Sequence, residues 1–145
     1  MAIKFESLTA RLRRFVGDRR AAPRYPVTHL EKALVVHITL GDGGDAMRGG
    51  ARLVGYTRDV SETGLGVVLP DVRIGGRLIV NPERALRLLV GLPTGAVEMT
   101  ATAVRYAEPE GDESGYLVGV HINEMPKAHR ALYLKFINSL AVGEM

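Results

Sequence analysis

The sequence contains no cysteine and no tryptophan, and only three Phe and five Tyr occur among its 145 residues. The absence of cysteine excludes a disulfide framework, a thiolate nucleophile and a cysteine-based zinc site, and it favours a reducing compartment. No apolar run approaches the roughly 20 residues that a membrane helix needs. The basic N-terminus also lacks the apolar core of a signal peptide. We therefore expect a cytoplasmic protein.

Charge is concentrated at one end of the chain. Residues 1–24, the N-terminal arm, contain seven Lys or Arg and two Asp or Glu and so carry +5, whereas the remainder carries −2. The formal net charge of +3 therefore comes from the arm, where an anionic partner should bind first. The composition is otherwise ordinary, with 46% hydrophobic and 24% charged residues, and predicts one globular domain with a short appendage.

The start of the N-terminal arm predicts a short amphipathic helix that ends near Gly17. Apolar residues recur there at helical spacing, and basic residues fill much of the rest; the apolar set is Phe5, Leu8, Leu12, Phe15 and Val16. This stripe is expected to pack on the domain or on a partner subunit, and the alternative is a basic helix lying on a membrane surface. We expect residues 1–18 to be a helical extension and residues 19–145 to be one domain.

The domain is expected to be mainly β, because short segments of β-forming residues alternate with turn signals. Strands are expected at residues 34–40, 51–60, 65–69, 77–80, 96–106 and 116–122, and turns or loops at residues 18–26, 41–50, 61–64, 70–76 and 108–115. Residues 81–90 fit either a strand, by the alternation of their leucines, or the start of a helix, by their Asn-Pro-Glu opening. The pattern indicates a small antiparallel barrel or sandwich.

A final helix is expected over residues 126–140, with Pro126 in its first turn. Its apolar stripe consists of Leu132, Tyr133, Phe136, Ile137 and Leu140. This helix is expected to cover one open end or face of the strands.

Residues that could support catalysis do not form a recognised pattern. The four histidines lack metal-ligand spacing, and Ser61 stands in Val-Ser-Glu-Thr-Gly rather than in the Gly-x-Ser-x-Gly elbow of hydrolases. The glycines of residues 41–50 lack the Lys and Ser/Thr of a phosphate loop. We therefore predict no catalytic residue, no metal site and no enzymatic activity.

One segment with binding chemistry is Arg20-Ala-Ala-Pro-Arg24, preceded by Arg19. The proline prevents a regular helix, so the guanidinium groups can point to one side of an irregular loop. Arginine forks suit phosphate oxygens and the O6/N7 edge of guanine, and they stack on base planes. A solvated arginine-rich linker is the alternative interpretation of this segment.

A second segment is Asp59-Val-Ser-Glu-Thr-Gly64. Alternation along the strand puts Asp59 and Ser61 on the same face. The Asp carboxylate can accept hydrogen bonds from N1–H and N2–H₂ of guanine, Ser61 adds a hydroxyl, and Gly64 permits a positive φ and a close backbone approach. The alternative interpretation is a plain hairpin turn.

Together the two segments resemble the PilZ family, whose pattern is Arg-x-x-x-Arg followed by Asp/Asn-x-Ser-x-x-Gly. Residues 25–58 separate them here, and the resemblance extends over residues 19–140 through Gly-Leu-Gly-Val, the late strand with Gly119-Val120 and the closing helix. One departure is Ile122, where the family often has an aromatic residue, and we expect it to be a packing position. The resemblance implies a six-stranded antiparallel β-barrel with a C-terminal helix.

The resemblance also implies a ligand, the bacterial second messenger cyclic diguanylate (cyclic di-GMP), and no other cofactor. Arg20 and Arg24 would contact phosphate and the Hoogsteen edge of guanine, Asp59 and Ser61 would contact guanine edges, and Gly64 would make room. Arg19 just before the pair is compatible with an intercalated dimer of the ligand, so two ligands per chain are expected; the alternative is that Arg19 merely belongs to the solvated arm.

The sequence is compatible with three functions. The first is a receptor that changes conformation on binding and signals to a downstream protein partner or to fused domains, with a homo-oligomer left open. The second is nucleic-acid binding through the N-terminal arm, which is not expected because aromatic residues for base stacking are few and the rest of the chain is net negative. The third is a ligand-free scaffold of the same fold, against which the intact motifs argue.

Overall fold

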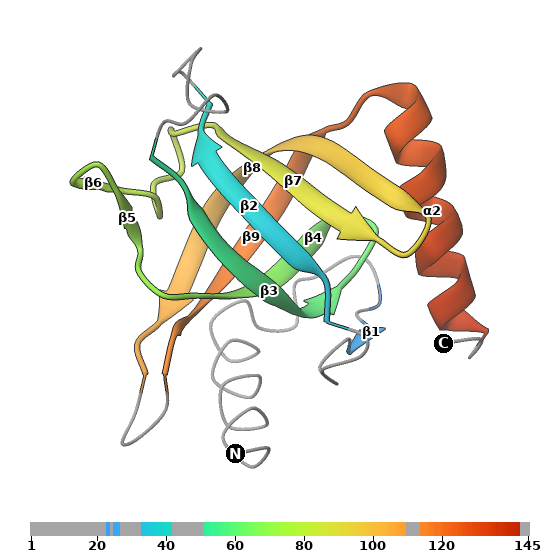
Figure 1. The fold of residues 1–145 in the computed structure, drawn as a ribbon, viewed down its shortest axis with the longest axis horizontal. Helices are drawn as coiled ribbons and strands as arrows, with labels where there is room; N and C mark the ends of the chain where they lie inside the picture. Colours follow the sequence, from blue (N-terminus) through green and yellow to red (C-terminus); the bar gives the residue numbers. More distant parts are fainter. Residues whose placement is uncertain (1–22, 24, 27–32, 42–50, 110–113, 143–145) are drawn as a thin grey trace.

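The described residues form a β-barrel with one helix at its end (Figure 1). The structure is a computed structural model that describes residues 23, 25–26, 33–41, 51–109 and 114–142. The strands are β1 (Tyr25–Pro26), β2 (Val35–Leu40), β3 (Leu53–Val60), β4 (Gly64–Leu69), β5 (Arg73–Ile74), β6 (Arg77–Leu78), β7 (Leu86–Leu92), β8 (Gly95–Ala107) and β9 (Tyr116–Glu124), and the helix is α2 (Lys127–Ala141).

Six strands close the barrel. They are hydrogen-bonded in the order β3-β2-β7-β8-β9-β4, every pair is antiparallel, and β4 pairs again with β3. Closure leaves no barrel strand with an unpaired edge. The short strand β1 adds to β3 from outside the ring. The expected six-stranded antiparallel barrel with a C-terminal helix is confirmed.

Strand β7 shows how side-chain alternation builds the interior. Leu86, Leu88 and Val90 are fully buried, whereas Arg87 between them is exposed. This is the period of two that a strand with one buried face requires. The segment before it forms a turn, in which the backbone N–H of Arg84 donates to the carbonyl of Asn81 at 3.0 Å. The strand interpretation of residues 81–90 is therefore the right one.

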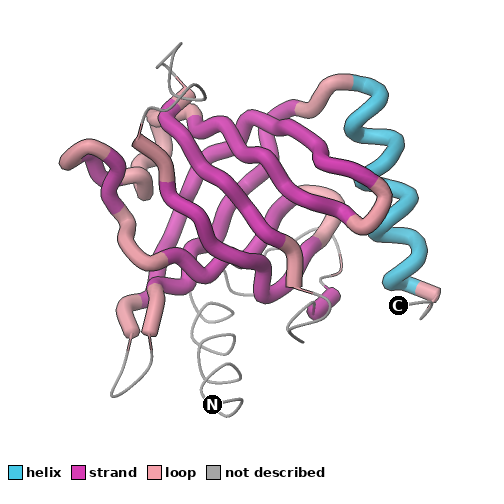
Figure 2. Tube along the Cα trace, in the orientation of Figure 1, coloured by secondary structure: helices cyan, strands magenta, loops and turns pink. Residues whose placement is uncertain are grey.

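Helix α2 lies across one end of the barrel, and Figure 2 shows it as the helix among the described residues. It packs against β8 and β1, and Tyr133, Phe136 and Ile137 are buried in the barrel core. The expected apolar stripe is confirmed. Pro126 differs from expectation: with φ −56° and ψ 146° it is the N-cap residue, and the helix begins at Lys127.

A second, smaller apolar cluster lies on the outer face of the barrel. Val68, Ala107 and Leu117 are buried there and pack with Tyr56. Their chain neighbours on β4 and β9 belong to the interior core, so these side chains point the other way. Cross-strand pairing joins them into one row across β3, β4, β9 and β8.

One expected turn contains a strand. Residues 70–76 contain β5 and are not only a turn; β5 pairs with β6 in a hairpin away from α2 (Figure 1). The expected helix of residues 1–18, most of the connection at residues 41–50 and the tip of the turn at residues 108–115 lie outside the described residues. Ile122 is buried in the core, as expected of a packing position. Over the described ranges, no helix has the length and apolarity to cross a membrane.

Candidate functional site

The turn between β3 and β4 is organised by Ser61. Its backbone N–H donates to the carbonyl of Gly64 at 2.9 Å, and its hydroxyl oxygen accepts from the backbone N–H groups of Gly64 at 3.1 Å and Thr63 at 3.3 Å. Ser61 is 1% exposed. Its hydroxyl therefore holds the turn, and a contact between this hydroxyl and a ligand stays a prediction.

Two other elements clamp the same turn. The buried hydroxyl of Tyr133 on α2 donates to the carbonyl of Ser61 at 2.6 Å, and the backbone N–H of Ile122 on β9 donates to the carbonyl of Thr63 at 2.8 Å. These bonds satisfy carbonyl groups that the turn itself leaves unused. The turn is thus fixed to the C-terminal helix and to the opposite strand.

A β-bulge at Arg58 directs Asp59 away from the core. Thr57 pairs with Val67 and Asp59 with Gly66, so Arg58 is the extra residue. Val67 and Val60 belong to the interior core, and a strand without a bulge would place Asp59 on that side. The bulge instead puts both Arg58 and Asp59 on the outer face, where they are 2% and 7% exposed.

Arg58 gives this part of the site a cation next to the carboxylate. Burial lowers the pKa of Arg58 below its usual value, and the nearby Tyr56 and Asp59 act in the opposite direction by favouring the charged guanidinium. An arginine remains charged under such conditions. Asp59 therefore lies beside a buried positive charge.

A second bulge lies on the other side of the same outer face. On β8 the pairing shifts between Ala103 and Arg105, which leaves Val104 as the extra residue. Between the two bulges, Gly66 pairs with Gly119, Asp59 pairs with Gly66, and Arg105 pairs with Gly119. Gly66 and Gly119, which we call the glycine floor, thus lie between a carboxylate and a guanidinium.

Strand β1 lies next to the Asp59 motif. Pro26 is opposite Asp59 and Tyr25 is opposite Val60. The expected ligand-binding arginines, Arg19, Arg20 and Arg24, precede Tyr25 in the chain and lie outside the described residues. Asp59, Ser61 and Gly64 are brought together at one end of β3 and β4.

Gly64 corrects one expectation. It begins β4 opposite His121, is buried, and is not one of the glycines with a positive φ, which among the described residues are Gly75, Gly76, Gly95 and Gly115. A left-handed conformation at Gly64 is therefore wrong. Sequence reasoning also missed the glycine floor and Arg105, although the break in alternation between Thr57 and Val60 is a signal that could have indicated the bulge.

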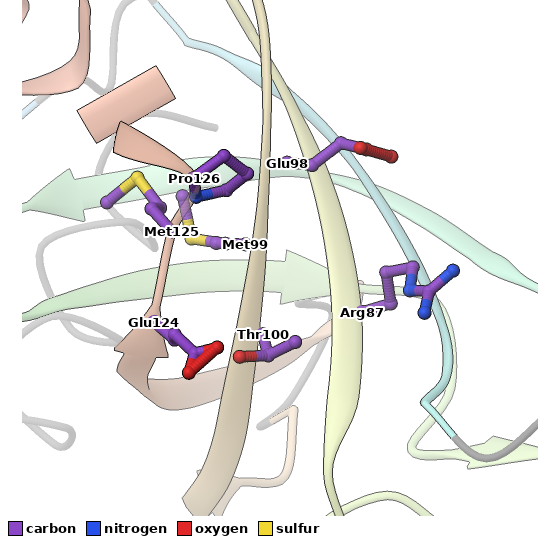
Figure 3. Close-up of a pocket in the computed structure, with 7 residues that line it drawn as sticks. All are labelled: Arg87, Glu98, Met99, Thr100, Glu124, Met125 and Pro126. Atoms are coloured by element: carbon purple, nitrogen blue, oxygen red, sulfur yellow. The ribbon is translucent and has the colours of Figure 1, made fainter. Parts of the chain in front are cut away.

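A separate hollow of about 420 Å³ lies where β7, β8 and β9 meet the start of α2 (Figure 3). Its lining residues are Arg87, Glu98, Met99, Thr100, Glu124, Met125 and Pro126. Figure 3 shows the Glu124 side chain near that of Thr100, while the Arg87 guanidinium points elsewhere. Two carboxylates against one guanidinium disfavour an anionic ligand here. In the described part of the chain, no cluster of His, Asp and Glu could hold a metal ion.

Comparison with solved structures shows the fold. The PilZ domain of YcgR from Escherichia coli with c-di-GMP is similar, with a TM-score of 0.63, 14% identity and coverage of 88% of this chain and 95% of that one. The inhibitor of motility MotI/DgrA from Bacillus subtilis has a TM-score of 0.62 and 18% identity, covering 89% and 54%. The K. pneumonia MrkH–c-di-GMP complex has a TM-score of 0.64 and 13% identity, covering 88% and 54%.

This chain therefore spans about half the length of the MotI/DgrA and MrkH chains. No curated protein matches the chain. A family model described as the PilZ domain matches residues 18–139, which include both segments singled out in the sequence, the barrel strands and most of α2. The chain belongs to the PilZ domain family.

Proposed function

We propose that this PilZ domain is a receptor for cyclic diguanylate. The single observation that carries the proposal is the pairing of β1 with β3, because Pro26 lies opposite Asp59 just after the Arg20-Ala-Ala-Pro-Arg24 segment. The strand that directly follows the arginine motif in the chain therefore adjoins the strand that contains Asp59. Solved structures with the same fold contain c-di-GMP, as in YcgR and MrkH, and this supports the ligand class.

The chemistry of the proposed contacts follows from the ligand. Asp59 accepts hydrogen bonds from N1–H and N2–H₂ of one guanine, a donor pair that adenine lacks. Arg20 and Arg24 bind the phosphates and the O6/N7 edge of guanine through charge-assisted forks. Ser61 and Gly64 belong to the same site because they form the turn that positions Asp59. Ser61 also contacts the guanine edge.

Arg19 extends the proposed site to two ligands. An intercalated dimer of cyclic diguanylate doubles the phosphate charge and exposes a further guanine plane. Arg19 stacks on that plane or pairs with the added phosphates. The proposed stoichiometry is two ligands per chain.

The proposed output is signalling rather than catalysis. Binding orders the arginine segment against β3 and changes its relation to residues 1–18, which we propose to be an extension outside the family domain; this is an order–disorder switch. A downstream partner or fused domain receives the signal. MotI/DgrA and MrkH, whose chains are about twice as long as the matched part, illustrate that this fold occurs within larger proteins.

Isothermal titration calorimetry with cyclic diguanylate tests the proposal directly. The parent is expected to bind, and Arg20→Ala or Arg24→Ala is expected to lower the affinity about tenfold to a hundredfold, because each removes a bidentate or charge-assisted contact. Arg87→Ala, on the outer face of β7, is the matched control. Circular dichroism of all variants should stay unchanged. A parent that does not bind, or arginine variants that bind like the parent, would contradict the assignment.

A further inference from the structure

We infer that Arg105 is a ligand contact at the far end of the glycine floor, opposite Asp59. The inference rests on the proposed function and adds a binding residue to it. Its basis is cross-strand pairing: Asp59, Gly66, Gly119 and Arg105 form one row on the outer face, across β3, β4, β9 and β8.

The two ends of this row are too far apart for one guanine to serve both. Three strand spacings of about 4.8 Å separate β3 from β8, which gives roughly 14 Å along the surface. Asp59 and Arg105 must then meet different parts of the ligand. Between them Gly66 and Gly119 add no side chain of their own to the outer face, but both residues are buried in this structure. A flat ring or base that spans the row must therefore displace the groups that bury these two glycines, and it then lies against backbone.

The two bulges support a role in binding, because they direct Asp59 and Arg105 to the same outer face. Each bulge sets two consecutive side chains on the outer face, Arg58 and Asp59 on β3, and Val104 and Arg105 on β8. Bulges of this kind re-aim side chains and are common beside binding and active sites. Here each bulge flanks one glycine of the floor.

The chemistry of Arg105 complements that of Asp59. Arg105 is exposed, and within the described ranges no carboxylate forms an ion pair with it. Asp59 can only accept hydrogen bonds, whereas the Arg105 fork can only donate them. A ligand with guanine donors at one end needs donors from the protein at its other end, where O6 and N7 of a second base or two phosphate oxygens form an acceptor pair.

The test compares three variants by calorimetry with cyclic diguanylate. Arg105→Ala is expected to weaken binding about tenfold to a hundredfold. Arg105→Lys should recover only part of this loss, because an ammonium group has the charge without the fork. Arg87→Ala changes another exposed strand arginine, away from the row, and this variant should bind like the parent. Unchanged thermal unfolding of each variant shows that the fold is intact.

The outcomes separate this inference from the function on which it rests. A parent that fails to bind overturns both. A parent that binds, with Arg105→Ala matching it or with Arg87→Ala losing as much affinity, overturns the role of Arg105 alone. An analogue of cyclic diguanylate with 7-deazaguanine bases lacks the N7 acceptor and so distinguishes the two acceptor pairs. If Arg105 binds the base edge, the loss of affinity caused by the analogue is smaller in Arg105→Ala than in the parent. If Arg105 binds phosphate, this loss is the same in both proteins.

Discussion

At the scale of single residues, the proposed specificity lies in a carboxylate that the backbone turns outward. Asp59 directly follows the bulge at Arg58 and pairs with Gly66 on β4. The buried cation of Arg58 lies beside it. A carboxylate in its charged form accepts hydrogen bonds and donates none. The position is therefore suited to a base edge that carries only donors.

The Asp59 carboxylate predicts that the protein discriminates between cyclic diguanylate and cyclic di-adenylate. Asp59→Ala should lower the affinity for cyclic diguanylate about tenfold to a hundredfold, since a hydrogen bond to a charged group is lost. The parent should reject cyclic di-adenylate, because N1 of adenine is an acceptor that would face the Asp59 carboxylate. Competition titrations measure both effects. Equal affinity of the parent for the two dinucleotides would disprove the assignment of Asp59.

The hydrogen bonds of the Ser61 hydroxyl predict that this residue stabilises the folded protein. Ser61→Ala removes the hydroxyl that accepts from the backbone N–H groups of Thr63 and Gly64, so the buried N–H of Gly64 and the partly buried N–H of Thr63 lose their acceptor. The expected cost is about 1–3 kcal/mol of unfolding free energy, seen as a melting temperature lower by several degrees. Ser114→Ala, at an exposed position, is the control. Equal melting temperatures for both variants would show that the hydroxyl does not hold the turn.

At the scale of elements, helix α2 and the turn of residues 61–64 form one unit. Tyr133 reaches from the barrel core to the carbonyl of Ser61, so the helix that closes the barrel also positions the turn after Asp59. The N-terminal half of the helix is attached separately, where Nδ1 of His129 accepts the backbone N–H of Glu98 on β8 at 2.8 Å. Displacement of α2 would therefore break the hydrogen bond between Tyr133 and Ser61 and change the position of the turn.

Tyr133→Phe tests this coupling. The ring and its packing are kept, but the Ser61 carbonyl loses a buried donor at 2.6 Å, at an expected cost of about 1–3 kcal/mol. Affinity for cyclic diguanylate should fall several-fold as well, because the turn is less well fixed. Calorimetry and thermal unfolding measure the two effects. Tyr106→Phe, which changes a half-buried tyrosine on β8, should alter neither; a Tyr133→Phe protein that behaves like it would contradict the coupling.

At the scale of the whole molecule, charge separates the competing functions. The N-terminal arm carries +5 and the rest of the chain −2, so binding of a polyanion would depend on the arm and on salt. A protein that neutralises 6–10 phosphates of a nucleic acid loses about 10³–10⁵ in affinity between 50 and 200 mM salt. A small ligand with two phosphates, held by forks and base edges, should lose far less.

Binding of RNA and of cyclic diguanylate at two salt concentrations checks this expectation. The affinity for cyclic diguanylate is expected to fall by no more than about tenfold over that range, whereas RNA binding should be weak and fall steeply. RNA binding that is tighter than the binding of cyclic diguanylate at both salt concentrations would favour the nucleic-acid function.

Ligand number is the remaining whole-molecule prediction. Calorimetry should give two cyclic diguanylate molecules per parent chain, and this number should fall toward one in Arg19→Leu. The leucine variant removes the stacking and phosphate contact on which the second ligand depends. One ligand per chain in both proteins would assign Arg19 to the solvated arm.

Much of the architecture could be predicted from the sequence because its determinants are local. Alternation in β7 and the apolar stripe of α2 are period-two and period-3.6 patterns that can be read within a few residues. The two family motifs likewise lie within short segments. From these follow most of the barrel strands, the closing helix, the PilZ fold and the residues proposed to bind the ligand. The sequence left residues 81–90 open between strand and helix, and it did not predict β5.

The arrangement on the outer face was decided only by tertiary structure. Gly66 and Gly119 are 53 positions apart in the sequence, and only the pairing of β4 with β9 makes them neighbours. The bulges at Arg58 and Val104 exist relative to partner strands, since an extra residue is extra only against a register. The sequence alone therefore determined which residues could bind, whereas the closing of the barrel decided which of them share a face, because strand register is a property of two segments at once.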